Sequence, residues 1–185
     1  MGFYGYSSER ERAVLEYPVF RMKGGIKVLI AVVSDTHNYL SILSKVEEEI
    51  QPADMVIHLG DVVEDAERLA EGFDGTLINV RGNCDFNSTI TSERLEVIEG
   101  KRVFITHGHN YNVKQDLLRL KYRAEEVEAD IVLYGHTHVA KVDYENGIWF
   151  MNPGSPSICR TGCNSIGLLE IDEEKIDCTI KLIIE

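Results

Sequence analysis

Apolar residues come in short unbroken runs that alternate with amphipathic segments along the first part of the chain. The run Lys27–Val33 is almost wholly aliphatic and rich in valine, which predicts a strand buried on both faces. Leu40–Ile50 predicts a helix, which ends at Gln51-Pro52 because the residue before a proline disfavours helical backbone. Met55–His58 predicts a second strand. Strands that alternate with helices in this way are typical of an α/β fold.

Further along the chain the alternation continues and then changes to hairpins. The remaining pattern predicts helices over Glu64–Glu71 and Val113–Glu128 and strands over Thr76–Val80, Val103–Ile105 and Ile131–Tyr134. After residue 139 we expect paired strands, Lys141–Tyr144 with Ile148–Met151 and Ile166–Ile171 with Ile176–Ile184. Asn146-Gly147 is a strong hairpin signal between the first pair. These elements predict an α/β sandwich that contains a mixed sheet.

Residues 1–25 differ in residue composition and pattern from the rest of the chain. They hold several aromatic residues, alternating Glu and Arg at residues 9–12, and the Gly24-Gly25 break. We interpret them as an N-terminal extension, with a short helix over residues 9–16, that precedes a single domain of residues 26–185. Two roles stay open for the extension. It is either a tail that packs on its own domain or an aromatic arm used in homo-oligomer contacts, where Phe and Tyr are favoured.

Composition and charge exclude several classes of partner. The chain has 185 residues, 44% hydrophobic and 27% charged, which favours one globular domain. Its 31 acidic residues outnumber 19 Lys and Arg, and a net charge of −12 disfavours a stably bound nucleic acid. The longest apolar run, Val28–Val33, is far shorter than the ~20 residues that span a membrane. With no secretory signal visible and four cysteines expected as reduced thiols, we expect a cytoplasmic protein without a membrane partner.

Chemistry-bearing side chains gather just after the predicted strands. Five of the six histidines lie there, with two aspartates and an asparagine, and the carboxyl ends of strands are where α/β sheets bind ligands. Residues i and i+2 of an extended chain point to the same side, so the pairs Asp35/His37 and His136/His138 can each converge on one point. His58 lies inside a strand, and we interpret it as a core or supporting histidine.

The expected ligand set suits a pair of metal ions. It comprises Asp35, His37, Asp61, Asn83, His107, His136 and His138. Imidazole and carboxylate favour Mn, Fe, Ni or Zn over Ca or Mg, and we favour Mn. Seven ligands are too many for one tetrahedral ion, but they suit two divalent ions that share a carboxylate. That arrangement is used for in-line attack at phosphorus, so we expect a metal-dependent phosphoesterase.

The motifs that carry these residues resemble the calcineurin-like metallophosphoesterase superfamily, and more specifically its small bacterial and archaeal phosphodiesterase branch. The matching segments are Ser34-Asp35-Thr36-His37, Gly60-Asp61, Gly82-Asn83, Thr106-His107-Gly108-His109, Tyr134-Gly135-His136-Thr137-His138 and Asn152-Pro153-Gly154-Ser155. The resemblance implies a four-layer αββα sandwich of two mixed β-sheets flanked by helices, with the metals at the carboxyl ends of the strands. It also implies that Asp61 bridges one ion held by Asp35, His37 and His138 and a second held by Asn83, His107 and His136. A hydroxide that bridges the two ions would then be the nucleophile.

The candidate catalytic residues are Asn83, Cys84, Asp85 and His109. Many superfamily members carry a histidine after the asparagine, where it supports leaving-group protonation, but this chain has Cys84. The general acid therefore stays open between Cys84, His109 and water, and Cys84 is either a poor acid or a small buried thiol that fills space. His109 would face the phosphate or support a ligand, and Asp85 either orients His109 or a neighbouring group or caps a turn.

Three functions follow from this resemblance. We expect a phosphodiesterase that acts on a small phosphoester. A phosphomonoesterase or nuclease is the first alternative, although no arginine cluster for a dianionic phosphate stands out. The second is a non-catalytic scaffold, similar to the retromer subunit of this fold, whose metal site is eroded. The completeness of the ligand set in this chain favours the enzyme.

Overall fold

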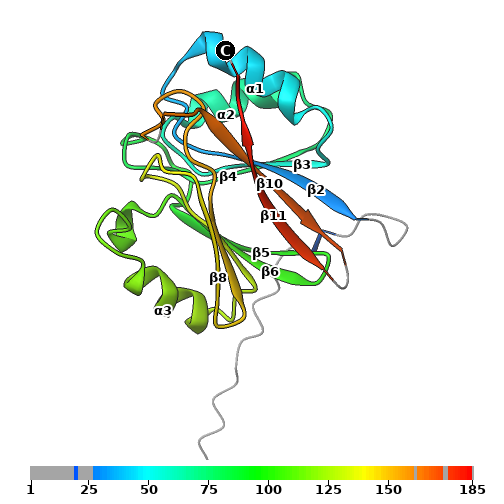
Figure 1. Cartoon of the computed structure of the whole chain (residues 1–185). Coiled ribbons are helices and arrows are strands. Elements are labelled where there is room, and N and C mark those ends of the chain that lie inside the picture. Colours follow the sequence, from blue (N-terminus) through cyan, green and yellow to red (C-terminus); the bar gives the residue numbers. More distant parts are fainter. Residues whose placement is uncertain (1–18, 21–26, 161, 173–174, 185) are drawn as a thin grey trace, which may run out of the picture.

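Two mixed sheets pack face to face in the computed structural model, which describes residues 19–20, 27–160, 162–172 and 175–184 (Figure 1). The five-stranded sheet has the order β11-β10-β2-β3-β4, with bounds β2 Val28–Val33, β3 Met55–His58, β4 Thr76–Asn79, β10 Ser165–Ile171 and β11 Ile176–Leu182. The other sheet has the order β1-β5-β6-β7-β9-β8. Its bounds are β1 Val19–Phe20, β5 Glu93–Ile98, β6 Lys101–Thr106, β7 Ile131–Leu133, β8 Lys141–Glu145 and β9 Ile148–Asn152.

Helices cover the outer face of each sheet and complete four layers. Helices α1 (Leu40–Ile50) and α2 (Val63–Glu71) pack on the five-stranded sheet, and α3 (Leu118–Glu126) packs on the other (Figure 1). A short 3₁₀ helix, η1 (His109–Tyr111), follows β6. Amphipathic spacing explains these contacts, since the apolar stripe of each helix faces the sheet. The predicted αββα sandwich is thus confirmed.

Aliphatic side chains fill the space between the two sheets. Ile57 on β3, Ile105 on β6 and Met151 on β9 are among those with no exposed surface. Each strand contributes alternate side chains to this layer and sends the others toward the helices, as the twofold periodicity of a strand requires. Strands β2 and β3 are therefore apolar on both faces, as their unbroken runs predicted. This packing holds the carboxyl ends of the central strands of both sheets at one edge.

Two element predictions were incomplete. Strand β5 was not expected, because Glu93–Ile98 mixes charged and apolar residues and lacks an unbroken apolar run. It forms through antiparallel pairing with β6 across the turn at Glu99-Gly100, where both residues have positive φ. The helix expected over residues 113–128 is shorter, at Leu118–Glu126. Pairing with the next strand in the chain thus decided one element that its own hydrophobic pattern did not indicate.

Little of the N-terminal extension is described. Val19–Phe20 form β1 and pair in parallel with β5. The predicted helix over residues 9–16 lies outside the described residues. None of the helices in the described part of the chain is long and apolar enough to cross a membrane.

Candidate metal centre

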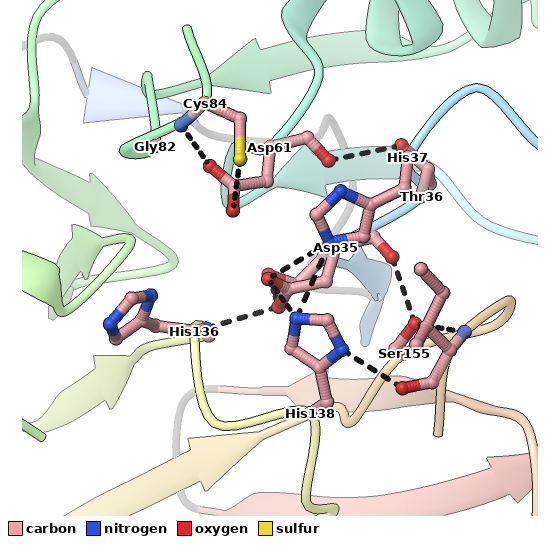
Figure 2. Close-up of polar contacts among 12 residues, drawn as sticks. Asp35, Thr36, His37, Asp61, Gly82, Cys84, His136, His138 and Ser155 are labelled. Atoms are coloured by element: carbon pink, nitrogen blue, oxygen red, sulfur yellow. Dashed lines mark hydrogen bonds and ion pairs between the residues drawn. The ribbon is translucent and has the colours of Figure 1, made fainter. Parts of the chain in front are cut away.

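The structure brings all seven predicted ligands to one edge of the sandwich, and Figure 2 shows five of them, Asp35, His37, Asp61, His136 and His138. The five-stranded sheet contributes residues that follow β2, β3 and β4, and the other sheet contributes residues that follow β6 and β7. Because the contributing strands are parallel within each sheet, their carboxyl ends share this edge. The site therefore spans both sheets.

One group of donor atoms comes from Asp35, His37 and His138. The Nε2 atom of His138 lies 3.1 Å from Asp35 Oδ1 and 3.3 Å from His37 Nε2. All three donor atoms lie within 4.8 Å of one another. Figure 2 shows the two imidazoles facing the same carboxylate. The group matches the set expected for one ion.

The second group comes from Asp61, His107 and His136. His107 Nε2 lies 3.4 Å from Asp61 Oδ2 and 3.2 Å from His136 Nδ1. Asn83 Oδ1 lies 3.2 Å from the same His107 nitrogen. Asp61 also falls within 4.8 Å of a donor atom of His37, which belongs to the first group. Asp61 is therefore in reach of both groups of donor atoms.

Backbone at these positions is left-handed, not extended. Asp35, His37, Asp61, His136 and His138 have φ between +51° and +68°. The expectation that the i, i+2 pairs converge through extended chain was wrong in its geometry, although the side chains do converge. Such conformations cost on the order of 1–3 kcal/mol each and persist where the surroundings hold them. Nothing in the local sequence signalled them.

Two glycines allow the loops from different strands to touch. A Cβ atom at Gly82 would overlap the carboxylate of Asp61, and one at Gly135 would overlap the hydroxyl of Ser34. Ser34 in turn donates a 2.6 Å hydrogen bond from its hydroxyl to Asp35 Oδ2. The donor groups can gather because these two positions carry no side chain.

Carbonyl groups orient two of the imidazoles. His107 Nδ1 lies 2.9 Å from the carbonyl of Leu59, and His138 Nδ1 lies 2.9 Å from the carbonyl of Ile158. Because a carbonyl only accepts, each Nδ1 carries a hydrogen and each Nε2 faces the other donor atoms. This is the arrangement that fixes the tautomer of a metal-ligating histidine.

The site is short of positive charge. Burial opposes ionisation of Asp35, yet its contact with His138 and the charge of His107 lower its pKa. Burial likewise opposes charge on His107, but Asp61 and Asp35 raise its pKa, and contact with Asp35 raises the pKa of His138. Burial, together with the charge of His107, lowers the pKa of His136 to about 4. The buried carboxylates of Asp35 and Asp61 thus favour positive charge on the groups beside them.

An orphaned atom supports the fit to metal ions. Asp35 Oδ1 is buried and makes no hydrogen bond of acceptable geometry, although it lies 3.1 Å from His138 Nε2. A buried carboxylate oxygen without a hydrogen bond is costly unless a cation is near. The imidazole, carboxylate and amide donors are those that first-row divalent ions accept. The residues present therefore fit divalent cations.

Positions outside the ligand set hold the loops in place. The hydroxyls of Ser155 and Ser157 donate to the carbonyl of Asp35 at 2.8 and 3.1 Å. The side-chain amide of Asn152 donates to the carbonyl of Gly135 at 2.9 Å. Residue-by-residue reasoning gave no role to Asn152 or Ser155, which entered only through a matching motif.

His58 links two ligand loops from inside the core. It has no exposed surface, and its Nδ1 accepts the N–H of Gly60 at 3.2 Å. Its Nε2 therefore carries the hydrogen and lies 3.3 Å from the hydroxyl of Thr36. Burial lowers its pKa to about 4, so it is neutral at pH 7. The prediction of a core or supporting histidine is confirmed.

Asp85 caps a turn. Its carboxylate accepts the N–H groups of Gly82, Asp61 and Val63 at 2.6, 3.0 and 3.0 Å. Of the two roles left open for it, the structure supports the cap, since these hydrogen bonds go to backbone groups of neighbouring residues and not to His109. Asp85 acts by positioning the backbone of Asp61.

Cys84 and His109 lie beside the donor atoms. The thiol of Cys84 donates to Asp61 Oδ2 at 3.3 Å, and the residue is exposed, so its interpretation as a buried space-filling thiol is wrong. Partial burial and Asp61 raise the pKa of this thiol to about 11. The ring of His109 lies 5.4 Å from that of His107, and its Nδ1 is buried without a hydrogen bond. Burial and the charge of His107 lower the pKa of His109.

Known proteins are similar to this chain in sequence. A family model described as a calcineurin-like phosphoesterase superfamily domain matches residues 28–174. Probable metallophosphoesterase YsnB of Bacillus subtilis is 34% identical over 154 residues, covering 77% of this chain and 85% of YsnB. Phosphodiesterase YfcE of Escherichia coli is 32% identical over 164 residues, covering 75% and 85%.

Solved structures of other proteins have a similar fold. A protein of Streptococcus pneumoniae, described as a predicted phosphoesterase, superposes with a TM-score of 0.71 at 31% identity, covering 85% of this chain and 90% of that one. Vps29 of Entamoeba histolytica, crystallised with zinc, superposes with a TM-score of 0.66 at 19% identity, covering 84% and 99%. The second likeness shows a shared fold.

Proposed function

The chain belongs to the calcineurin-like phosphoesterase superfamily, and from this premise we propose that its metal centre is dinuclear and hydrolyses a small phosphodiester. The observation that carries the proposal is the place of Asp61, in reach of donor atoms from both ligand groups. A carboxylate shared in this way is what a two-ion site requires. The relative named phosphodiesterase YfcE supports the diester as substrate.

We assign the ligands as two sets with one shared member. Asp35, His37 and His138 would hold one cation, and Asn83, His107 and His136 the other, with Asp61 common to both. Manganese is our proposed ion among Mn, Ni, Fe and Zn. When bound, the cations would supply Lewis-acid stabilisation of phosphate charge and lower the pKa of a water.

Residues around the ligands orient two imidazoles and can supply a proton to the leaving group. The carbonyls of Leu59 and Ile158 aim His107 and His138 into the site. Cys84 holds its proton on Sγ at neutral pH, because its pKa is raised, and it is a weak donor toward a leaving oxygen. His109 is a second candidate donor, and its ring lies beside that of His107.

Metal analysis combined with turnover tests this function. We expect two equivalents of divalent metal by mass spectrometry of untreated protein. We also expect faster turnover of bis(4-nitrophenyl) phosphate than of 4-nitrophenyl phosphate. Chelation should abolish turnover while circular dichroism still reports the fold, with a melting temperature some degrees lower because bound ions stabilise the native state. A faster monoester reaction, or global unfolding on chelation, would contradict the proposal.

The scaffold interpretation is tested by the same assay. The fold likeness to Vps29 is compatible with a scaffold, but it shows shared architecture alone. All seven ligand positions in this chain carry residues that can bind metal, and the structure gathers them. Absence of turnover from protein loaded with two ions would favour the scaffold.

We further propose a cytoplasmic homo-oligomer assembled through residues 1–25. Apart from Val19–Phe20, these residues lie outside the described part of the chain. Deleting them should change the sedimentation profile while turnover per site stays within a few-fold. A large loss of turnover in a folded truncation would show that the segment contributes to the pocket.

A further inference from the structure

A cleft of about 600 Å³ adjoins the metal centre and is not needed to hold the ions. Its walls come from α2 and from the loop that follows β4. Cys84 belongs to both places, since it lines the cleft and its thiol contacts Asp61. A ligand whose phosphate lies at the donor atoms can therefore extend past Cys84 into this cleft.

Phe86 is exposed on the rim of this cleft. It lines the cleft and its side chain is 87% exposed. The preceding residue, Asp85, is fixed by three backbone N–H groups, and Ser88 donates its N–H to the Asp85 carbonyl at 3.1 Å. A single exposed phenylalanine needs no explanation on an ordinary surface. This one lies in a fixed turn, two residues from Cys84, with one face free to stack.

A charged group on the same cleft is also fixed. Arg68 donates from Nη1 to Asp65 Oδ1 at 2.9 Å and to Asn38 Oδ1 at 3.3 Å. Asp65 is fully buried, and its other oxygen accepts the N–H of Asn38, the residue after His37. Glu64 and Glu67 are exposed on the same cleft and offer hydrogen-bond acceptors. The cleft therefore combines an aromatic face with acceptors and one anchored cation.

We propose that this cleft is a subsite for one ester group of the phosphodiester, and that this group is a planar ring bearing hydrogen-bond donors, as in a nucleoside. Phe86 would stack on the ring, and Glu64 and Glu67 would accept hydrogen bonds from hydroxyl or amino groups. These two carboxylates outnumber Arg68, so the cleft disfavours a further phosphate. The substrate is then a small nucleoside diester and not a polynucleotide. This inference rests on the proposed function for the position of the phosphate.

Two phosphonates of similar size test the stacking. Phenylphosphonate and cyclohexylphosphonate carry the same charged group, and we expect metal-loaded protein to bind the planar one at least about fivefold more tightly, the lower end of stacking contributions. Phe86→Ala should bring the affinity ratio near one, while Phe86→Trp should preserve it. Tyr122→Ala removes another exposed aromatic, on α3, and should leave the ratio unchanged. Isothermal titration calorimetry gives the affinities without turnover.

Nucleotides test the donor-bearing ring and the limit on charge. Adenosine 5′-monophosphate should bind more tightly than ribose 5-phosphate in a manner that depends on Phe86, and adenosine 3′,5′-bisphosphate should bind no more tightly than the monophosphate. An equal ratio in wild type and Phe86→Ala, no binding of either phosphonate, or an adenosine group without effect would each overturn the proposal.

A parallel assay separates this subsite from the proposed function. Metal-dependent turnover of bis(4-nitrophenyl) phosphate with a phosphonate ratio near one removes the subsite alone. A Phe86-dependent ratio without any turnover supports the subsite and removes the hydrolase.

Discussion

The inter-sheet core is fully buried and the metal centre is partly buried, and the two regions are built in opposite ways. The core consists of aliphatic side chains on regular strands, such as Ile57, Ile105 and Met151, none of which needs a polar partner. The centre packs carboxylates and imidazoles at 3.1–3.4 Å on residues with left-handed backbone. Burial of one large aliphatic side chain contributes about 1.5–3 kcal/mol to folding, whereas each strained residue costs on the order of 1–3 kcal/mol.

This difference shows which interactions hold each region in its native conformation. The core is self-sufficient, because apolar contacts stabilise it without any bound group. The centre depends on its surroundings, including the backbone cap by Asp85 and the hydroxyl of Ser155 on the Asp35 carbonyl. We therefore expect substitutions in the core to lower the free energy of unfolding and substitutions in the metal centre to lower turnover.

The variant with the largest expected effect on turnover is Asp61→Asn. Loss of the shared carboxylate should remove metal occupancy and lower turnover by at least about 10³-fold, because a metal ion contributes several kcal/mol of transition-state stabilisation. Metal analysis and turnover of a nitrophenyl diester measure both effects. Asp177→Asn, at an exposed ion pair on β11, is the matched control and should change neither. Two bound ions and a near-normal rate in Asp61→Asn would reject the bridging role.

Cys84→His should raise the rate of hydrolysis of esters with poor leaving groups. It places a group with a reference pKa near ~6.5 where the present thiol has a pKa of about 11. General-acid catalysis contributes roughly 10²–10⁴ in rate, so the gain should appear with alkyl esters and be small with nitrophenyl esters, whose leaving group needs no proton.

Cys84→Ser is the control for that variant, because serine is of similar size and supplies no better acid. Equal slowing of both substrate classes by Cys84→His would indicate distorted Asn83 geometry. Unchanged rates in a folded, metal-loaded variant would remove the acid role of this position.

A variant on the core side is Ile171→Ala. Ile171 is fully buried on β10 opposite Val28, at the end of β2 remote from the ligands. The free energy of unfolding should fall by about 2–5 kcal/mol, as for other buried Ile→Ala changes, while turnover per folded, metal-loaded molecule stays within twofold. Urea unfolding and single-substrate kinetics measure the two. A large loss of turnover without loss of stability would show that core and centre are not separate.

The last variant concerns His58, which is buried in the core and contacts two ligand loops. Its pKa is about 4 in the folded chain against ~6.5 in the unfolded chain, so the unfolded state binds the proton more readily. Stability is therefore full above pH 6.5 and falls by about 1.4 kcal/mol per pH unit as pH drops toward 4. His58→Asn keeps an acceptor for Gly60 and does not titrate. Urea unfolding of chelator-treated proteins should show the difference in stability changing across this range, and parallel curves would contradict the assignment.

Much of this protein was determined by local sequence. The unbroken apolar run of β2 predicted a strand buried on both faces, and the Asn146-Gly147 turn predicted the β8–β9 hairpin. The ligand residues were predictable because parallel strands place their carboxyl ends at one edge of their sheet, so that residues after β2 and β3 are neighbours, as are residues after β6 and β7. These properties depend on the spacing of apolar residues and on the direction of the chain, both of which can be read from the sequence.

Other properties were decided only by tertiary structure. Asp85 became a cap because three N–H groups from two loops converge on it. The left-handed backbone of Asp61 and His136 is imposed by loops in contact across two sheets. The cleft beside Phe86 likewise forms between α2 and a loop that is distant in sequence. Such features arise from contacts between segments far apart in the chain, and no local pattern of residues encodes them.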